Sequence, residues 1–586
     1  MFELLFLSAA VWLSYLGVIN SGFVSDDIEG LVNYDGKLKK FDYGHLNKWI
    51  LYKLFNKSPQ ENHRFSILLH NANVILLFSF LVNFLPIKAA FYASLLFAVH
   101  PICIQSIAWI SGRGYPIGLF FCLLNFNFIA ISQNNPLFTS TAALQSLNLA
   151  ILTIAYGCFY YVAVNAQFAC LMTFAIQAFF GNYYLSVMGL IISAVTGFGI
   201  VKEVIGLRTK VFKEQNLEKS TKLKPQKIIV AIKTLAYYTR LCLFPKRMGL
   251  YHTFEYHYSE KTEKEDKWFW FGFFILLGLV AGFIYGSFII KLGILWYLAY
   301  IMIFLNWVTI HQFVSERYLY IASIGLFILS GYCLFLLDGF LFAGFPVLMA
   351  LIGGILIART WVHLPTYQDE VLFYQSNIWN FPDSEVAFSN LGVVYMKCKL
   401  IGSAVDMWQI AIKINPQYDV AYYNISSVLK QKGDFIGARE YLKKAVETPQ
   451  CHFKELWGKE LESLEHEINY SKENTELGKR LLLLEADPAK KSEVQNIRKQ
   501  LDEINNLHKK FEESQKQNLV LVQREEKQLK ERLVQLDKEK IEFSKPLNME
   551  ILVKARDNNF ILVKETVDRM LKIENTNKEN TSNAKT

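Results

Sequence analysis

Long apolar runs dominate the chain up to about residue 360, and charged and polar residues dominate the remainder. A helix that crosses a membrane needs about 20 consecutive, mostly apolar residues, and by this criterion the chain holds about eleven candidate spans. The spans cover residues 2–20, 66–86, 88–110, 115–132, 141–162, 165–181, 184–201, 269–290, 292–313, 318–338 and 341–358. Polar loops at 21–65 and 202–267 interrupt them. The pattern predicts an all-α fold with a polytopic membrane bundle over residues 1–360.

A repeat follows the last span. Asn390 and Asn424 are 34 residues apart, and so are Ala404 and Ala438. This period is typical of tetratricopeptide (TPR) repeats, in which small residues let two antiparallel helices pack closely. We therefore expect TPR-like helical repeats over 366–450.

The end of the chain is rich in Lys, Glu, Gln and Asn. Residues 451–545 suit a degenerate helical repeat followed by a charged helix that forms a possible coiled coil. Residues 546–586 suit a helical segment and then a tail whose composition indicates disorder.

Composition narrows the class of protein. The chain is 52% hydrophobic and 15% aromatic, which is too apolar for an ordinary soluble protein of this size. The net charge of +9 comes largely from lysines in the loops and tail, so solvated surfaces explain it without a nucleic-acid partner. The eight cysteines show no metal-binding spacing, and no metal is predicted. The apolar stretch near the N-terminus lacks a basic flank, and we expect a retained membrane helix.

Two adjacent acids, Asp26 and Asp27, begin the first polar loop just past the first span. Acids beside hydrocarbon are costly, so they are candidates for function. Neighbouring side chains on an extended segment point opposite ways, so one carboxylate can face a reaction centre while the other anchors the loop. A positioned carboxylate suits a general base for a hydroxyl acceptor. A solvated loop with Asp as helix N-cap is the alternative.

Two further segments carry candidate chemistry. In 99–116, Pro101 breaks an apolar span between His100 and Arg113. Broken helices are tolerated at membrane depth where they line a cavity, and Arg113 suits either a phosphate or an interface anchor. In 311–325, a guanidinium at the membrane interface suits a lipid-linked phosphate. An ion pair that pins a helix hairpin is the alternative.

These three segments, in this order and followed by TPR-like repeats, resemble the transmembrane and TPR-containing protein O-mannosyltransferases and their bacterial relatives. These proteins belong to the GT-C superfamily of glycosyltransferases. The segments His70–Asn73, 242–254 and 360–392 match the same pattern. The resemblance covers about residues 1–450 and departs from the family at Gln105, where an acidic residue is common.

The resemblance implies that a sugar, mannose in the family, moves with inversion from a lipid-phosphate donor to a protein Ser or Thr hydroxyl. The donor is a polyprenyl or dolichyl phosphate sugar, and no cofactor is needed. The implied catalytic residues are Asp26 and Asp27. The implied donor-phosphate residues are His100, Arg113 and Arg317, with Glu316 and Gln105 in support.

The implied partners are membrane lipid, the lipid-linked sugar and a protein acceptor held on a TPR face that includes Asn390 and Asn424. An odd number of spans with a cytoplasmic N-terminus puts the first loop and the TPR tail on the extracytoplasmic side, periplasmic or luminal. Two alternatives stay open: a non-catalytic TPR membrane scaffold, and a ligase for polyprenyl-linked glycans.

Overall fold

The structure is a computed structural model. It describes residues 2–28, 49, 52–55, 58–134, 225–250, 252, 267–306, 314–341, 345–449, 451, 453–485, 490 and 492–510. Over these ranges the regular elements are helices, and none is a strand, which confirms the predicted all-α fold.

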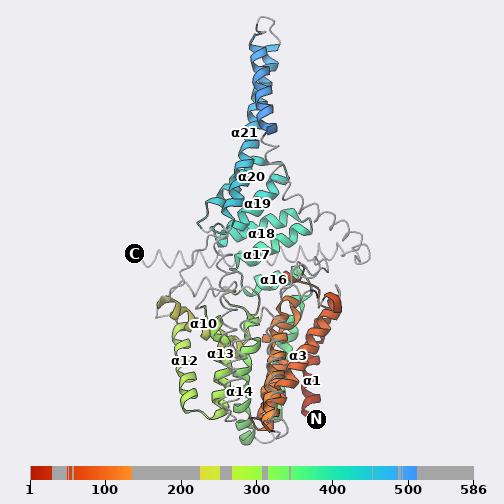
Figure 1. Cartoon of the computed structure of the whole chain (residues 1–586), viewed down its shortest axis with the longest axis vertical. Coiled ribbons are helices and arrows are strands. Elements are labelled where there is room, and N and C mark those ends of the chain that lie inside the picture. Colours follow the sequence, from red (N-terminus) through yellow and green to blue (C-terminus); the bar gives the residue numbers. More distant parts are fainter. Residues whose placement is uncertain are drawn as a thin grey trace. The chain divides into compact units, whose positions relative to one another are not determined.

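Five of the described helices are long and apolar enough to cross a membrane, or six if the bent pair α4 (Ile87–Val99) and α5 (Ile104–Ala108) is one span. The five are α1 (Phe2–Tyr15), α3 (Pro59–Leu81), α12 (Lys267–Tyr285), α14 (Leu319–Leu341) and α15 (Phe345–His363), some extended by 3-10 turns. Helices α1 and α3 pack against each other (Figure 1). These five helices are thus long and apolar enough to span a membrane, which is compatible with membrane association. The expected spans 141–162, 165–181 and 184–201 lie outside the described residues.

Helix bounds depart from the expected spans where polar residues are buried. Helix α3 begins at Pro59, well before the expected start at 66, because Ser58 caps it and Pro59 fits its first turn. Its polar first turns are buried against other elements. The expected span 292–313 is instead the shorter α13 (Phe288–Ile301), followed by a 3-10 turn at Met302–Phe304.

Helices α13 and α14 touch closely at a pair of glycines. A Cβ atom added at Gly325 would collide with the carbonyl oxygen of Gly293 and with the backbone of Tyr297. Small residues at such crossings let membrane helices approach backbone to backbone. This contact fixes α14, and with it the 3-10 turn η7 (Glu316–Tyr318) that precedes it. The remaining apolar or amphipathic helices are α6 (Gly114–Asn134) and α10 (Pro225–Leu243).

The chain divides into two compact units, the first with Met1–Val428 and Lys444–Lys454, the second with Leu429–Lys443 and the chain from Glu455. The tail helices are α16 (Glu370–Asn380), α17 (Glu385–Lys397), α18 (Ile401–Ile414), α19 (Asp419–Gln431) and α20 (Phe435–Glu447). Within the first unit, Ala404 and Ala411 of α18 are fully buried, and Gly392 of α17 lies against the Trp408 ring. This is the close helix pairing that the repeat predicts.

In the second unit, the long helix α21 (Lys454–Glu485) packs against the helical residues 492–510. The Tyr470 ring stacks on His508 with centroids 3.7 Å apart, and the Tyr470 hydroxyl donates to Asn505 at 2.8 Å. The region expected to hold a degenerate repeat therefore begins with one long helix. Most of the expected coiled coil lies outside the described residues.

Candidate functional site

The break between α4 (Ile87–Val99) and α5 (Ile104–Ala108) bends the chain by 53° at His100 and Pro101. The His100 imidazole Nδ1 accepts from the backbone N–H of Ile102 at 3.1 Å, so this ring caps the turn that follows. Proline has no N–H to donate, which frees carbonyl groups before it. The Tyr15 hydroxyl donates a hydrogen bond to the His100 carbonyl at 2.7 Å, and the Thr360 hydroxyl donates one to the Val99 carbonyl at 3.2 Å. His100 is therefore committed to shaping the break.

The two loop acids have opposite environments, although they lie in a helical turn and not on the extended segment that we expected. Asp27 is fully buried, and its carboxylate accepts from the backbone N–H of Ile110 at 3.2 Å. It also accepts from the N–H and the hydroxyl of Ser111 at 2.7 and 2.6 Å. Asp26 is exposed. Asp27 thus anchors the loop to the helix-break segment, while the Asp26 carboxylate is exposed.

Other contacts hold the backbone around these acids. The Gly22 N–H donates to the Gln368 carbonyl at 2.9 Å, and the His63 ring nitrogen Nε2 lies 3.2 Å from the Gly22 carbonyl. The Tyr374 hydroxyl donates to the Ser25 hydroxyl at 3.3 Å. Ser25 has a φ of 54°, a left-handed conformation that costs a non-glycine residue about 1–3 kcal/mol. Such strain persists only where neighbouring contacts fix the backbone. The backbone beside Asp26 is therefore held in place.

We expect the free energy of unfolding to fall as pH rises from about 4 to about 6. Burial raises the pKa of Asp27 from 3.8 to about 6, against the lowering by its hydrogen bonds from Ser111 and Ile110 and by Arg113. In this window the folded protein keeps a proton that the unfolded chain has lost, so rising pH removes stability, by about 3 kcal/mol in total. Thermal unfolding of the wild type and of Asp27→Asn across this range measures it. A difference between the two that stays constant with pH would refute this assignment.

Arg113 is buried with 1% of its surface exposed, and its guanidinium is bound by α3. Its Nε donates to the Ser66 hydroxyl at 3.0 Å, and its two terminal nitrogens donate to the Asn62 side-chain and backbone oxygens at 3.2 and 2.8 Å. The guanidinium also lies over the Phe65 ring at 5.4 Å. These contacts join the helix-break segment to α3. They also occupy the guanidinium N–H groups of Arg113 that a bound phosphate would need.

Gln105 joins the second motif to the third. Its side-chain oxygen accepts from the backbone N–H of Arg317 at 2.7 Å and from the Ser315 hydroxyl at 3.1 Å. A carboxylate would accept the same two hydrogen bonds, so the departure from the family keeps this acceptor. The Gln105 amide nitrogen is buried without a hydrogen-bond partner among the described residues.

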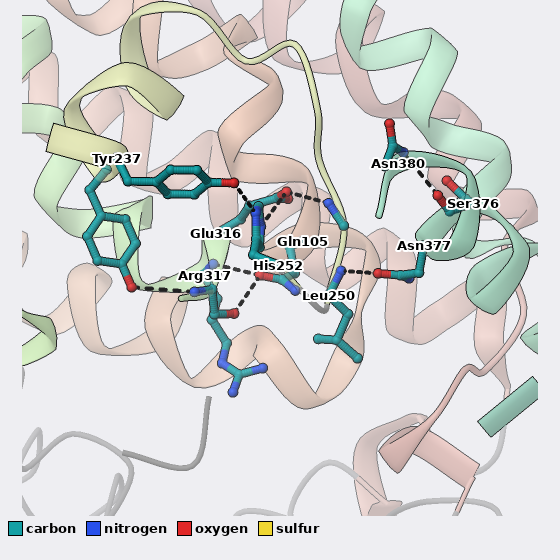
Figure 2. A network of polar contacts seen from close by, with 12 residues as sticks. Gln105, Tyr237, Leu250, His252, Glu316, Arg317, Ser376, Asn377 and Asn380 are labelled. Atoms are coloured by element: carbon teal, nitrogen blue, oxygen red, sulfur yellow. Dashed lines mark hydrogen bonds and ion pairs between the residues drawn. The ribbon is translucent and has the colours of Figure 1, made fainter. Parts of the chain in front are cut away.

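Glu316 binds the segment 249–252 (Figure 2). One of its carboxylate oxygens accepts from the Gly249 N–H at 2.6 Å and lies 3.4 Å from His252 Nε2. His252 Nδ1 in turn lies 2.9 Å from the Tyr237 hydroxyl. From the other side, the Asn377 side-chain oxygen on α16 accepts from the Leu250 N–H at 2.6 Å. Glu316 and α16 thus clamp this segment between them.

The Arg317 side chain points away from that network (Figure 2). Its guanidinium lies over the Trp109 ring at 4.9 Å and over the Tyr318 ring at 5.2 Å. One terminal nitrogen, Nη1, is buried with no hydrogen-bond partner in the described part of the chain. Three residues were expected at a donor phosphate: His100, Arg113 and Arg317. Of these, only Arg317 has a buried side-chain nitrogen that lacks a hydrogen-bond partner in the described part of the chain.

The helix-break segment 109–113 therefore touches both other motifs. Ile110 and Ser111 bind the carboxylate of Asp27 in the first polar loop (loop one), while Trp109 packs on Arg317. Sequence reasoning did not single out Trp109, His252 or Asn377 as site residues. The signal was present, because all three lie in segments that match the family pattern.

The asparagines expected on the TPR face lie on separate helices. Asn390 is on α17 and Asn424 is on α19, and both are partly buried. The Asn424 amide nitrogen has no hydrogen-bond partner within the described ranges. No group of three or more His, Cys, Asp or Glu residues in those ranges could hold a metal ion.

Comparison with known proteins identifies one repeat. The tetratricopeptide repeat family matches residues 420–449, the span of α19 and α20. No curated protein and no solved structure matches the chain. The match confirms the repeat read from the 34-residue period, and TPR repeats in general mediate contacts between proteins.

Proposed function

We propose that this protein is a membrane glycosyltransferase that moves a sugar from a lipid-phosphate donor to a protein hydroxyl. The observation that supports this most is the shared contact of segment 109–113 with the Asp26–Asp27 loop and with Arg317. A transfer of this kind needs a base for the acceptor and a cation for the leaving phosphate. Asp26 and Arg317 supply these two groups from elements that one short segment joins.

In the proposed reaction, the oxygen of an acceptor Ser or Thr hydroxyl attacks C1 of the sugar on the face opposite the phosphate. Asp26 accepts the hydroxyl proton as the new C–O bond forms. The bond from C1 to the phosphate oxygen breaks, and its electron pair leaves with the lipid phosphate beside Arg317. Attack from the opposite face inverts the configuration at C1. By the family resemblance, the sugar is mannose.

We further propose that the TPR helices bring the protein acceptor, with Asn390 and Asn424 toward its backbone. Asparagine side chains hydrogen-bond a peptide backbone without reading its sequence. Loop one and α16 are in direct contact, so the proposed base and the first tail helix share one side of the membrane helices. By the resemblance, that side is extracytoplasmic.

A non-catalytic TPR scaffold is the second candidate, and one observation favours it. Two of the expected phosphate ligands, His100 and Arg113, are committed to internal hydrogen bonds. A scaffold would keep such contacts for stability and would need no donor site.

Transfer of label separates the candidates. The protein in nanodiscs is incubated with radiolabelled polyprenyl phosphate mannose and a Ser/Thr-rich polypeptide. Label in the polypeptide, released by alkaline β-elimination, supports the transferase. Label in a lipid-linked glycan supports a ligase instead. No label in either, with a polypeptide that still binds the tail, supports the scaffold.

A further inference from the structure

Trp109 carries an indole N–H that the described protein leaves unused. The residue is buried, with 3% of its surface exposed, and its Nε1 atom has no hydrogen-bond partner among the described residues. Two other buried indoles are satisfied: Trp296 donates to the Ile321 carbonyl at 2.9 Å, and Trp408 donates to the Ser389 carbonyl at 3.0 Å. A buried donor without a partner costs about 1–3 kcal/mol, so it calls for an acceptor.

The neighbour of this indole also has one unused donor, although its guanidinium hydrogen-bonds the Tyr115 and Tyr318 side chains. The Arg317 guanidinium lies over the Trp109 ring at 4.9 Å, and its Nη1 is also buried without a hydrogen-bond partner in the described ranges. Indole and guanidinium groups are donors only and cannot satisfy one another. Two such donors side by side suit a ligand that brings acceptor oxygens and negative charge, and phosphate brings both.

Further aromatic rings cluster on one side of Arg317, beginning with Tyr318 under its guanidinium at 5.2 Å. Tyr318 stacks on Phe304 with centroids 4.1 Å apart and meets the Tyr115 ring edge-on at 6.1 Å. The charged neighbour Glu316 is turned to the other side, where it binds Gly249. Walls of this kind exclude water and strengthen a charged hydrogen bond within them.

We propose that the Trp109 indole N–H is a second donor to the phosphate of a lipid-borne ligand, beside Arg317. The inference rests on the proposed function for its choice of ligand, a polyprenyl phosphate. It adds a binding residue whose role is to orient the phosphate, because a neutral, rigid donor fixes direction where a guanidinium supplies charge. The Trp109 ring also keeps Arg317 in place by stacking.

Replacing Trp109 by Phe tests the role of the N–H alone. Phe keeps an aromatic face for Arg317 and removes the donor. We expect Trp109→Phe to raise the Kd for radiolabelled polyprenyl monophosphate in nanodiscs about tenfold, the usual effect of losing one hydrogen bond to a charged group. The smaller Phe ring leaves space at this buried site, so thermal unfolding of the unliganded variant measures the change in packing separately from the Kd. Trp379→Phe is the matched control, since Trp379 is 57% exposed on α16.

A double-variant cycle tests whether both donors bind one ligand. Trp109→Phe and Arg317→Lys together should weaken binding by less than the product of their separate effects, because the two share one phosphate. Inorganic phosphate is the second probe. We expect it to compete only weakly, since it lacks the lipid chain.

Two outcomes would overturn the inference. The first is an unchanged Kd in Trp109→Phe. The second is inorganic phosphate that binds as tightly as the lipid, which would reject the lipid source. The proposed transfer reaction is tested separately from this inference. The Asp26→Asn variant should bind polyprenyl phosphate with the normal Kd even where it transfers no sugar.

Discussion

Asp26→Asn is expected to lower the rate of sugar transfer by about a thousandfold and to leave the melting temperature unchanged. A positioned general base contributes about 10²- to 10⁴-fold to a proton-transfer step, and an amide cannot accept the hydroxyl proton. The side chain of Asp26 is exposed, so its replacement disturbs little packing. Initial rates with labelled donor, together with thermal unfolding of each variant, measure both parts.

The neighbouring acid provides the control. Asp27→Asn should lower the melting temperature, because an amide cannot replace every hydrogen bond that the buried carboxylate accepts from Ile110 and Ser111. The adjacent variants therefore separate chemistry from folding. Full transfer activity in Asp26→Asn would remove this residue from the base role.

Arg113→Ala is expected to destabilise the folded protein by about 3–5 kcal/mol, the usual effect of breaking a buried charged network. The variant removes three hydrogen bonds to α3 and leaves the Asn62 and Ser66 oxygens without their donor. It also removes the positive charge nearest to the buried Asp27. Yield in detergent and the thermal unfolding midpoint report the effect.

Arg64→Ala is the matched control on the same helix. Arg64 pairs with Glu61 one turn away, and about half of its side chain is exposed. Exposed pairs of this kind contribute about 0–1 kcal/mol. Should Arg113→Ala fold as well as Arg64→Ala while binding donor poorly, Arg113 would be a phosphate ligand after all.

Sequence predicted the class of fold because long apolar runs and a 34-residue period are strong signals. It predicted the helix break at Pro101 for the same reason, since proline cannot continue a helix without freeing carbonyl groups. Helix ends were harder. The polar first turns of α3, with Asn62 and His63, look like loop in a hydropathy pattern, yet they are helical and buried because Arg113 and the Gly22 carbonyl meet them.

The site could be predicted only in outline. The sequence left open which of the two adjacent acids anchors the loop, and only the contact with Ser111 shows that it is Asp27. Arginine at a membrane boundary suits a phosphate or an anchor equally well. The distinction between Arg113 and Arg317 depends on partners about 50 to 200 residues away along the chain, which no local pattern reveals.

Helix α16 has a consequence for how this chain can be divided. It precedes the first full helix pair and looks like part of the repeat array, yet its residues bind loop one and the segment 249–252. A chimera that exchanges the tail at residue 366 would therefore discard Tyr374 and Asn377 and remove their contacts with the two loops. An exchange at 382 keeps both. The best junction for attaching a different acceptor-recruiting tail to the membrane helices therefore lies after α16. Lineages that exchange tails should inherit α16 together with the membrane helices.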